Sequence, residues 1–198
     1  KGDDTMKHVT VIIIIFFLSL TGCAIRRNPF NYFSQTHIYR TNDNSILLTF
    51  DDGPCENTRI ILDMLKENNI TAAFFVVGKN AVKYPELVQR IIDEGHYLGS
   101  HSYTHPSFLN LSMEEAIEEV TKTEKIIAQY TSLRWFRPPF GELSYEMSRW
   151  LEKRNYQIIR WSAGAENAQP GDIVLMHETS HDLKMLPKII ESIKRQLN

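Results

Sequence analysis

Residues 45–54 have the sequence Ser-Ile-Leu-Leu-Thr-Phe-Asp-Asp-Gly-Pro, and this stretch decides the fold. Its first six residues form an apolar run of strand length, and the Gly-Pro pair is a turn signal that ends the run. Two carboxylates, Asp51 and Asp52, lie between the strand and the turn. The stretch therefore predicts a buried strand whose carboxyl end carries two acidic side chains.

Strands and helices alternate along the rest of the chain. Apolar runs of strand length occupy residues 45–50, 72–77, 97–100, 134–136, 157–161 and 173–176. Helical spacing or capping signals indicate helices around 60–65, over 85–95, after Ser112, over 145–153 and over 186–197. This alternation predicts βαβ units and a parallel sheet, that is, an α/β fold.

Four reactive side chains follow directly after predicted strands. They are Asp51, His101, Arg137 and His177. Taken singly, each has an ordinary interpretation as a turn residue, a structural histidine or a solvated arginine. In parallel α/β folds, however, functional groups gather at the carboxyl ends of the strands. We therefore expect the four side chains to converge on one rim of the sheet.

Four short motifs contain these residues, and their order along the chain is distinctive. They are Thr-Phe-Asp-Asp-Gly-Pro at 49–54, His-Ser-x-x-His at 101–105, Arg-Pro-Pro-Phe-Gly at 137–141 and Leu-x-His at 175–177. Together they resemble the polysaccharide deacetylase family, the NodB-like metal-dependent carbohydrate esterases. The resemblance covers Ser45 to about Leu197. It implies a distorted, incomplete (β/α) barrel, in agreement with the alternation of strands and helices.

The resemblance also implies a metal site and a general base. Asp52, His101 and His105 match the family's metal ligands. Mixed nitrogen and oxygen ligands suit Zn²⁺, and three protein ligands leave a position open for water. Asp51 matches the base that takes a proton from that water, and Arg137 matches the residue that pairs with the base.

Further roles follow from the same resemblance. His177 matches the acid that protonates the leaving amine. The backbone N–H of Phe140 would help to hold the oxyanion, and Leu175 would line the pocket for the acetate methyl group. Trp161 ends a predicted strand on the same rim and is a candidate for the wall of the substrate groove. The implied reaction is hydrolysis of an N-acetyl group on a sugar.

One segment departs from the family pattern. The fourth family motif usually supplies an Asp that supports the catalytic arginine, and a helix normally follows it. Here residues 161–171 read Trp-Ser-Ala-Gly-Ala-Glu-Asn-Ala-Gln-Pro-Gly. Glu166 is the candidate replacement for the Asp, and the helix is missing or shortened near residues 162–171.

The N-terminal region has the pattern of a bacterial lipoprotein signal. A basic start at Met6 precedes an apolar run over residues 9–20, which is too short to span a bilayer comfortably. The end of the run, Leu-Thr-Gly-Cys at 20–23, resembles a lipobox, which implies lipid on Cys23. We expect residues 1–22 to be an expression remnant and signal peptide, 23–44 a lipid anchor and polar tether, and 45–198 the deacetylase domain. The expected location is the bacterial cell envelope.

Composition and charge exclude several classes of protein. The chain has 198 residues, 22 Lys+Arg against 24 Asp+Glu and a net charge of -2. This balance argues against a nucleic-acid partner, and 2 cysteines cannot make a disulfide framework. The length fits one domain, and we expect a monomer.

Two polar segments are expected at the surface. The acidic residues Glu114, Glu115, Glu118 and Glu119 are expected on a solvated helix face, and residues 178–181 in an exposed loop.

Three functions of different classes are compatible with these residues. The favoured one is removal of N-acetyl groups from a cell-envelope glycan, above all peptidoglycan N-acetylglucosamine, because the anchored protein would lie beside it. A second is a glycan-binding lipoprotein that keeps the metal ligands without turnover, as the shortened fourth motif suggests. A third is a metal-dependent phosphoesterase, which is disfavoured because no second set of metal ligands is evident.

Overall fold

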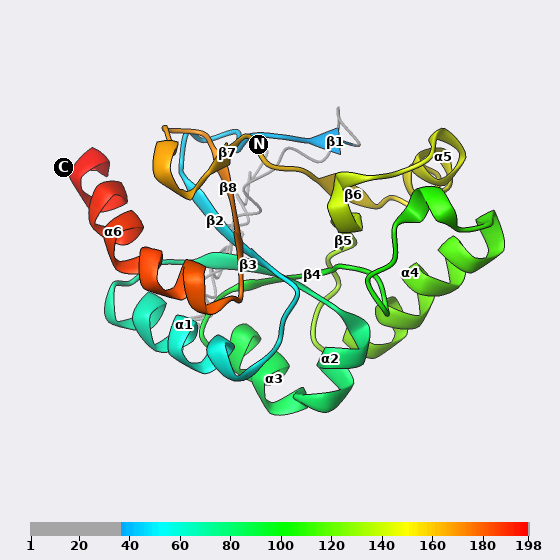
Figure 1. Cartoon of the computed structure of the whole chain (residues 1–198), viewed down its shortest axis with the longest axis horizontal. Helices are drawn as coiled ribbons and strands as arrows, with labels where there is room; N and C mark the ends of the chain where they lie inside the picture. The colour runs from blue at the N-terminus through cyan, green and yellow to red at the C-terminus, as the bar shows by residue number, and fades with distance from the viewer. Residues whose placement is uncertain (1–36, 198) are drawn as a thin grey trace, which may run out of the picture.

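The fold of residues 37–197, the part that the computed structural model describes, is a curled parallel sheet with helices on its outer face (Figure 1). The strands are β1 (His37–Ile38), β2 (Leu47–Asp51), β3 (Ala72–Val76), β4 (Tyr97–Ser100), β5 (Trp135–Phe136), β6 (Gln157–Ile159), β7 (Ala163–Gly164) and β8 (Ile173–His177). The helices are α1 (Glu56–Glu67), α2 (Gly78–Lys83), α3 (Pro85–Asp93), α4 (Met113–Ile127), α5 (Tyr145–Glu152) and α6 (Ser180–Leu197), with short 3-10 segments η1 (Phe108–Asn110), η2 (Pro139–Gly141) and η3 (Ala165–Asn167). Each strand and helix that the sequence predicts is present, and β1, β7 and α2 are additional.

The sheet closes on itself only in part. Its order is β1-β6-β5-β4-β3-β2-β8-β7, and all neighbouring strands are parallel. β6 and β7 stand near opposite ends of this order, yet only residues 160–162 join them. The chain from Ile159 to Ala163 spans at most about 14 Å, so the two ends of the sheet approach each other. The expected incomplete (β/α) barrel is therefore confirmed.

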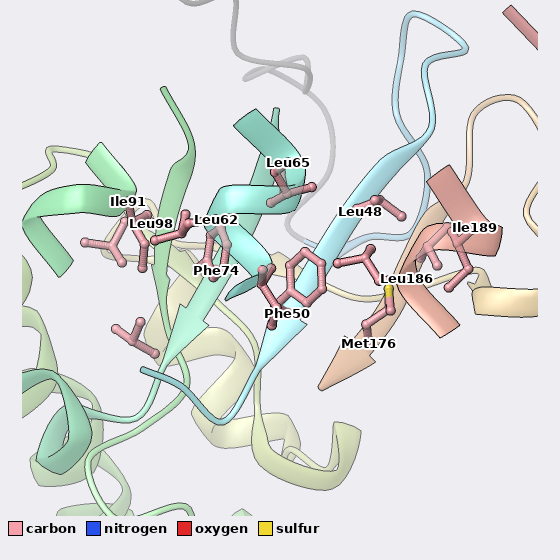
Figure 2. Packing of buried hydrophobic residues seen from close by; sticks show 14 of the residues in the cluster. Leu48, Phe50, Leu62, Leu65, Phe74, Ile91, Leu98, Met176, Leu186 and Ile189 are labelled. Atoms are coloured by element: carbon pink, nitrogen blue, oxygen red, sulfur yellow. The ribbon is translucent and has the colours of Figure 1, made fainter. Parts of the chain in front are cut away.

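The outer face of the sheet packs against the helices through one set of alternating residues. Successive side chains of a strand point to opposite faces, and here the even-numbered ones of β2, β3, β4 and β8 face outward. Figure 2 shows Leu48, Phe50, Phe74, Leu98 and Met176 of the strands against Leu62, Leu65, Ile91, Leu186 and Ile189 of the helices. Burying one such side chain fully contributes about 1.5–3 kcal/mol, so this layer fixes the helices on the sheet.

The odd-numbered residues of the same strands face the barrel interior. Their apolar members Leu47, Ala73, Phe75 and Ile173 form a second buried cluster with Ile38 of β1, Trp135 of β5 and Ile159 of β6. At Gly99 a Cβ atom would come within 2.6 Å of the Phe75 ring, so only glycine allows this close packing. The same alternation of side chains continues to the ends of β2, β5 and β8. It places Asp51, Arg137 and His177 on the interior side of the sheet.

Two boundaries differ from the sequence analysis. Residues 37–38, assigned there to the tether, pair with β6 as β1. Helix α6 begins at Ser180 rather than at 186, because the Thr179 hydroxyl accepts the N–H of Asp182 (3.2 Å) and caps the helix. Cys23 and the proposed signal lie outside the described residues. Within residues 37–197, no helix is long and apolar enough to cross a membrane.

Candidate active site

A buried ion pair lies at the carboxyl ends of β2 and β5. The Arg137 side chain is fully buried, Asp51 is 3% exposed, and Nη1 of Arg137 donates to Oδ1 of Asp51 at 2.8 Å. Burial lowers the pKa of the Arg137 guanidinium, while the Asp51 carboxylate opposes that shift. Because Oδ1 is engaged by the arginine, the carboxylate is fixed in orientation. Its second oxygen, Oδ2, lies 3.7 Å from Nε2 of His101.

Backbone carbonyls, and not Glu166, support the arginine. Nε of Arg137 donates to the carbonyl of Ile159 (3.1 Å), and Nη2 donates to the carbonyl of Arg160 (2.9 Å). Nη1 also donates to the hydroxyl of Thr49 (2.7 Å). In the described part of the chain, Asp51 is the acid paired with Arg137, and Glu166 is exposed in η3. The expected role of Glu166 is therefore not seen in the structure, because the guanidinium donates instead to the carbonyls of Ile159, at the end of β6, and of Arg160, directly after it.

Three metal-ligating side chains converge beside this pair. The ligand atoms of Asp52, His101 and His105 lie within 4.8 Å of one another. Oδ1 of Asp52 is 3.2 Å from Nε2 of His105 and 3.6 Å from Nε2 of His101. Asp52 and His105 have φ of 74° and 66°, a left-handed conformation that is strained in non-glycine residues and recurs at active sites. The Asn80 amide of α2 holds the Asp52 turn by donating to its carbonyl at 2.8 Å.

The donor set fits a divalent cation. Oδ1 of Asp52 is buried without a hydrogen-bond partner, a costly state that a metal ion would relieve. Nδ1 of His101 lies 2.6 Å from the carbonyl of Arg137. Because a carbonyl only accepts, Nδ1 carries the proton and Nε2 presents a lone pair to the cluster. Burial lowers the pKa of His101, which favours the neutral form that a metal ligand requires.

A glutamate of α4 holds the loop that carries the two histidines. Oε2 of Glu119 accepts the backbone N–H groups of Tyr103 (2.8 Å) and Thr104 (2.7 Å). The expectation of a fully solvated acidic face was therefore wrong for Glu119, although Glu114 and Glu118 are exposed. No local sequence signal identifies this role, since the partners are backbone groups of another segment.

The end of β8 brings His177 next to Asp51. The two residues are register partners in the β2–β8 pair, and the N–H of Glu178 donates to the carbonyl of Asp51 at 3.2 Å. Glu178 is 6% exposed, contrary to the exposed loop expected there, and burial raises its pKa to about 7. Its carbonyl accepts the side-chain amide of Asn57 (3.0 Å), so the β8–α6 junction is tied to the start of α1.

The remaining candidate residues surround these groups. Phe140 has φ of 58° and is 65% exposed, and its ring centroid lies 4.8 Å from that of His105. The Trp161 ring is 5.8 Å from the Arg137 guanidinium. Leu175 is half-buried on β8, two residues before His177 and on the same side of the sheet. The structure therefore brings Phe140 and Trp161 to the site and places Leu175 beneath it.

Comparisons with known proteins agree with this geometry. The family model for polysaccharide deacetylase matches residues 39–159. A peptidoglycan-N-acetylglucosamine deacetylase of Bacillus cereus is 34% identical over 177 residues, covering 77% of this chain and 64% of the relative. The chain thus spans slightly less than two thirds of that relative.

Solved structures give the same result. A crystal structure of a peptidoglycan N-acetylglucosamine deacetylase has a TM-score of 0.76 at 32% identity, covering 81% of this chain and 87% of the other. A CE4-family pseudoenzyme from Bacillus anthracis has a TM-score of 0.74 at 29% identity, covering 81% and 64%. The fold is thus shared by proteins described as enzymes and by one described as a pseudoenzyme.

Proposed function

This chain belongs to the polysaccharide deacetylase family, and from that premise we propose that it hydrolyses N-acetyl groups of a cell-envelope glycan. Peptidoglycan N-acetylglucosamine is the favoured substrate, because similar proteins carry that name. The observation that carries the proposal is the buried Asp51–Arg137 pair beside the cluster of Asp52, His101 and His105. A base of fixed orientation next to a metal site is one arrangement that can activate water to hydrolyse an amide.

The proposed mechanism assigns each group one task. Asp52, His101 and His105 would hold the cation, most favourably Zn²⁺, which supplies Lewis-acid activation of water and of the acetyl carbonyl. Asp51, held by Arg137 through Oδ1, accepts a proton from the attacking water at Oδ2. The water oxygen bonds to the acetyl carbon, and the backbone N–H of Phe140 stabilises the negative charge on the carbonyl oxygen.

The second half of the reaction needs an acid. His177 gives a proton to the nitrogen as the C–N bond breaks, and the electron pair of that bond stays on the nitrogen. The products are acetate and a free amino sugar. Leu175 and Trp161 are assigned to the acetate pocket and the groove wall by their positions on β8 and directly beyond β6.

A lipid anchor at Cys23 is part of the same proposal. Its support is the apolar run at 9–20 followed by Leu-Thr-Gly-Cys. We expect the chain, when made in a bacterium that processes lipoproteins, to incorporate labelled fatty acid, and Cys23→Ser to abolish the label. Equal labelling of both chains would contradict the anchor.

A non-catalytic, glycan-binding role is the second candidate. The short η3 segment in place of a helix and the likeness to a pseudoenzyme favour it. A phosphoesterase with two metals is not favoured, because the described residues contain one three-ligand cluster.

Acetate release separates the two candidates. The full chain, stripped of metal with a chelator and reloaded with Zn²⁺, is incubated with N-acetylglucosamine oligomers and with purified peptidoglycan. We expect release with the metal and none without it. Stoichiometric metal with retained glycan binding but no acetate would contradict the enzymatic proposal and support the binding protein.

A further inference from the structure

The start of helix α6 carries a carboxylate that faces His177. We propose that Asp182 is a positioning residue, which holds the His177 imidazole so that Nε2 delivers the proton to the leaving nitrogen. This inference rests on the proposed function and deepens it. Asp182 lies outside the four sequence motifs, so the motifs do not predict this role.

The position of Asp182 is fixed by several contacts. Its Oδ2 accepts the backbone N–H of His177 at 2.6 Å and lies 3.6 Å from Nδ1 of the same residue. Its own N–H donates to the Thr179 hydroxyl that caps α6. The side chain is 20% exposed, and a helix N-terminus favours negative charge. The carboxylate is therefore held in place beside the imidazole.

A capping role alone does not account for this geometry. An acid at this position of a helix ordinarily bonds back to the N-cap residue, as Glu115 does with Ser112 in α4. Asp182 instead reaches past the cap to the end of β8. Its distance to Nδ1 is longer than a hydrogen bond, but such contacts in free enzymes often shorten when substrate binds. A small rotation of the exposed imidazole would close it.

The other nearby acids are engaged elsewhere. Asp51 binds Arg137, and Glu178 bonds to the Thr58 hydroxyl. Across the described part of the chain, Asp182 is the carboxylate within 4 Å of the His177 ring.

The contact with Asp182 determines which nitrogen of His177 gives up its proton. With Nδ1–H directed to Asp182, Nε2 is the nitrogen free to face substrate, and the charged imidazolium is stabilised before transfer. After the Nε2 proton moves to the leaving nitrogen, His177 remains neutral with its proton on Nδ1. Without the Asp182 carboxylate, the described residues place no acid within 4 Å of the ring to select its tautomer.

Substrates with different leaving groups test the inference. An amine must be protonated to leave, whereas the phenolate of 4-nitrophenyl acetate leaves without a proton. We expect Asp182→Asn to lower kcat on an N-acetylglucosamine oligomer at least about tenfold with KM unchanged. On the aryl ester the same variant should differ from wild type by less than about twofold. Asp182→Glu should restore part of the loss, and His177→Ala should show the same preference for the ester.

A matched control and a second readout complete the test. Glu115→Gln alters the capping carboxylate of α4 and leaves Asp182 and its contacts intact, so it should lower the melting temperature without changing the amide-to-ester ratio. In ¹⁵N NMR spectra, His177 should carry its neutral-form proton on Nδ1 in wild type and lose that preference in Asp182→Asn. Equal losses on both substrates, or an unchanged tautomer, would overturn the role of Asp182. A wild-type chain that releases no acetate would instead contradict the proposed function, while the NMR result would still decide the role of Asp182.

Discussion

Replacing Asp51 by Asn is expected to lower kcat for acetate release by about 10²–10⁴-fold, the usual contribution of a general base. The amide keeps the shape of the side chain and can still accept a hydrogen bond from Arg137. It cannot take a proton from water, because an amide oxygen is far too weak a base. Metal binding should persist, since Asp52, His101 and His105 form the ligand cluster and Asp51 lies outside it.

The same substitution is expected to reduce stability. It leaves the fully buried Arg137 without its counter-charge, and removing one partner of a buried pair costs about 3–5 kcal/mol. Because Asn still bonds to Nη1, we expect the lower end of that range. Urea unfolding of the metal-loaded chain measures this loss, and kcat is then determined well below the unfolding transition.

Thr49→Val is the matched control for this prediction. It removes the other acceptor of Nη1, which lies 2.7 Å away, without touching a carboxylate. Because the Thr49 hydroxyl also donates to the carbonyl of Val174 (2.8 Å), the change removes two buried hydrogen bonds, one of them to a charged group. We expect a loss of stability of about 2–4 kcal/mol and turnover within about tenfold of wild type. Wild-type turnover in Asp51→Asn would refute the base assignment, and so would a fall in turnover that merely follows a fall in bound metal.

Patterns of residue type and spacing predicted the framework of the site. Asp51, His101, Arg137 and His177 were placed on one rim because each follows a strand of a parallel sheet. The structure confirms the sheet, and the alternation of side chains explains why all four face inward. This much can be predicted because the alternation of side chains is a local property of each strand. The connections between parallel strands also follow a general rule, so the carboxyl ends of the strands meet at one rim of the sheet.

The contacts that hold those residues could not be predicted in the same way. Arg137 is supported by backbone carbonyls of residues 159 and 160, and a carbonyl has no signature in sequence. A search for an acid therefore led to Glu166, which is exposed. Glu119 and Asp182 were missed for the converse reason. Each is an ordinary helix-surface acid by pattern, and its partner is set by how a distant loop or strand end packs.

Removal of a metal ligand is the second large effect. His101→Ala is expected to raise the dissociation constant for Zn²⁺ by more than about 100-fold, because even outer-shell substitutions cost 10–100-fold. His101 supplies one of three ligands, and its orientation is fixed by the 2.6 Å contact to the Arg137 carbonyl. Titration against a chromophoric chelator measures the change, and acetate release should fall in parallel at limiting metal.

His96→Ala separates ligand loss from damage to the fold. His96 is 2% exposed, close to the 3% of His101, but it lies at the opposite end of β4, where Nδ1 accepts the N–H of Ala72 at 3.2 Å. Both variants delete a buried imidazole and should destabilise the chain. Only His101→Ala should lose the metal, since His96 lies outside the ligand cluster. Comparable loss of Zn²⁺ affinity in both would mean that the metal responds to the packing of the barrel, and the assignment of Asp52, His101 and His105 as a preformed site would then be wrong.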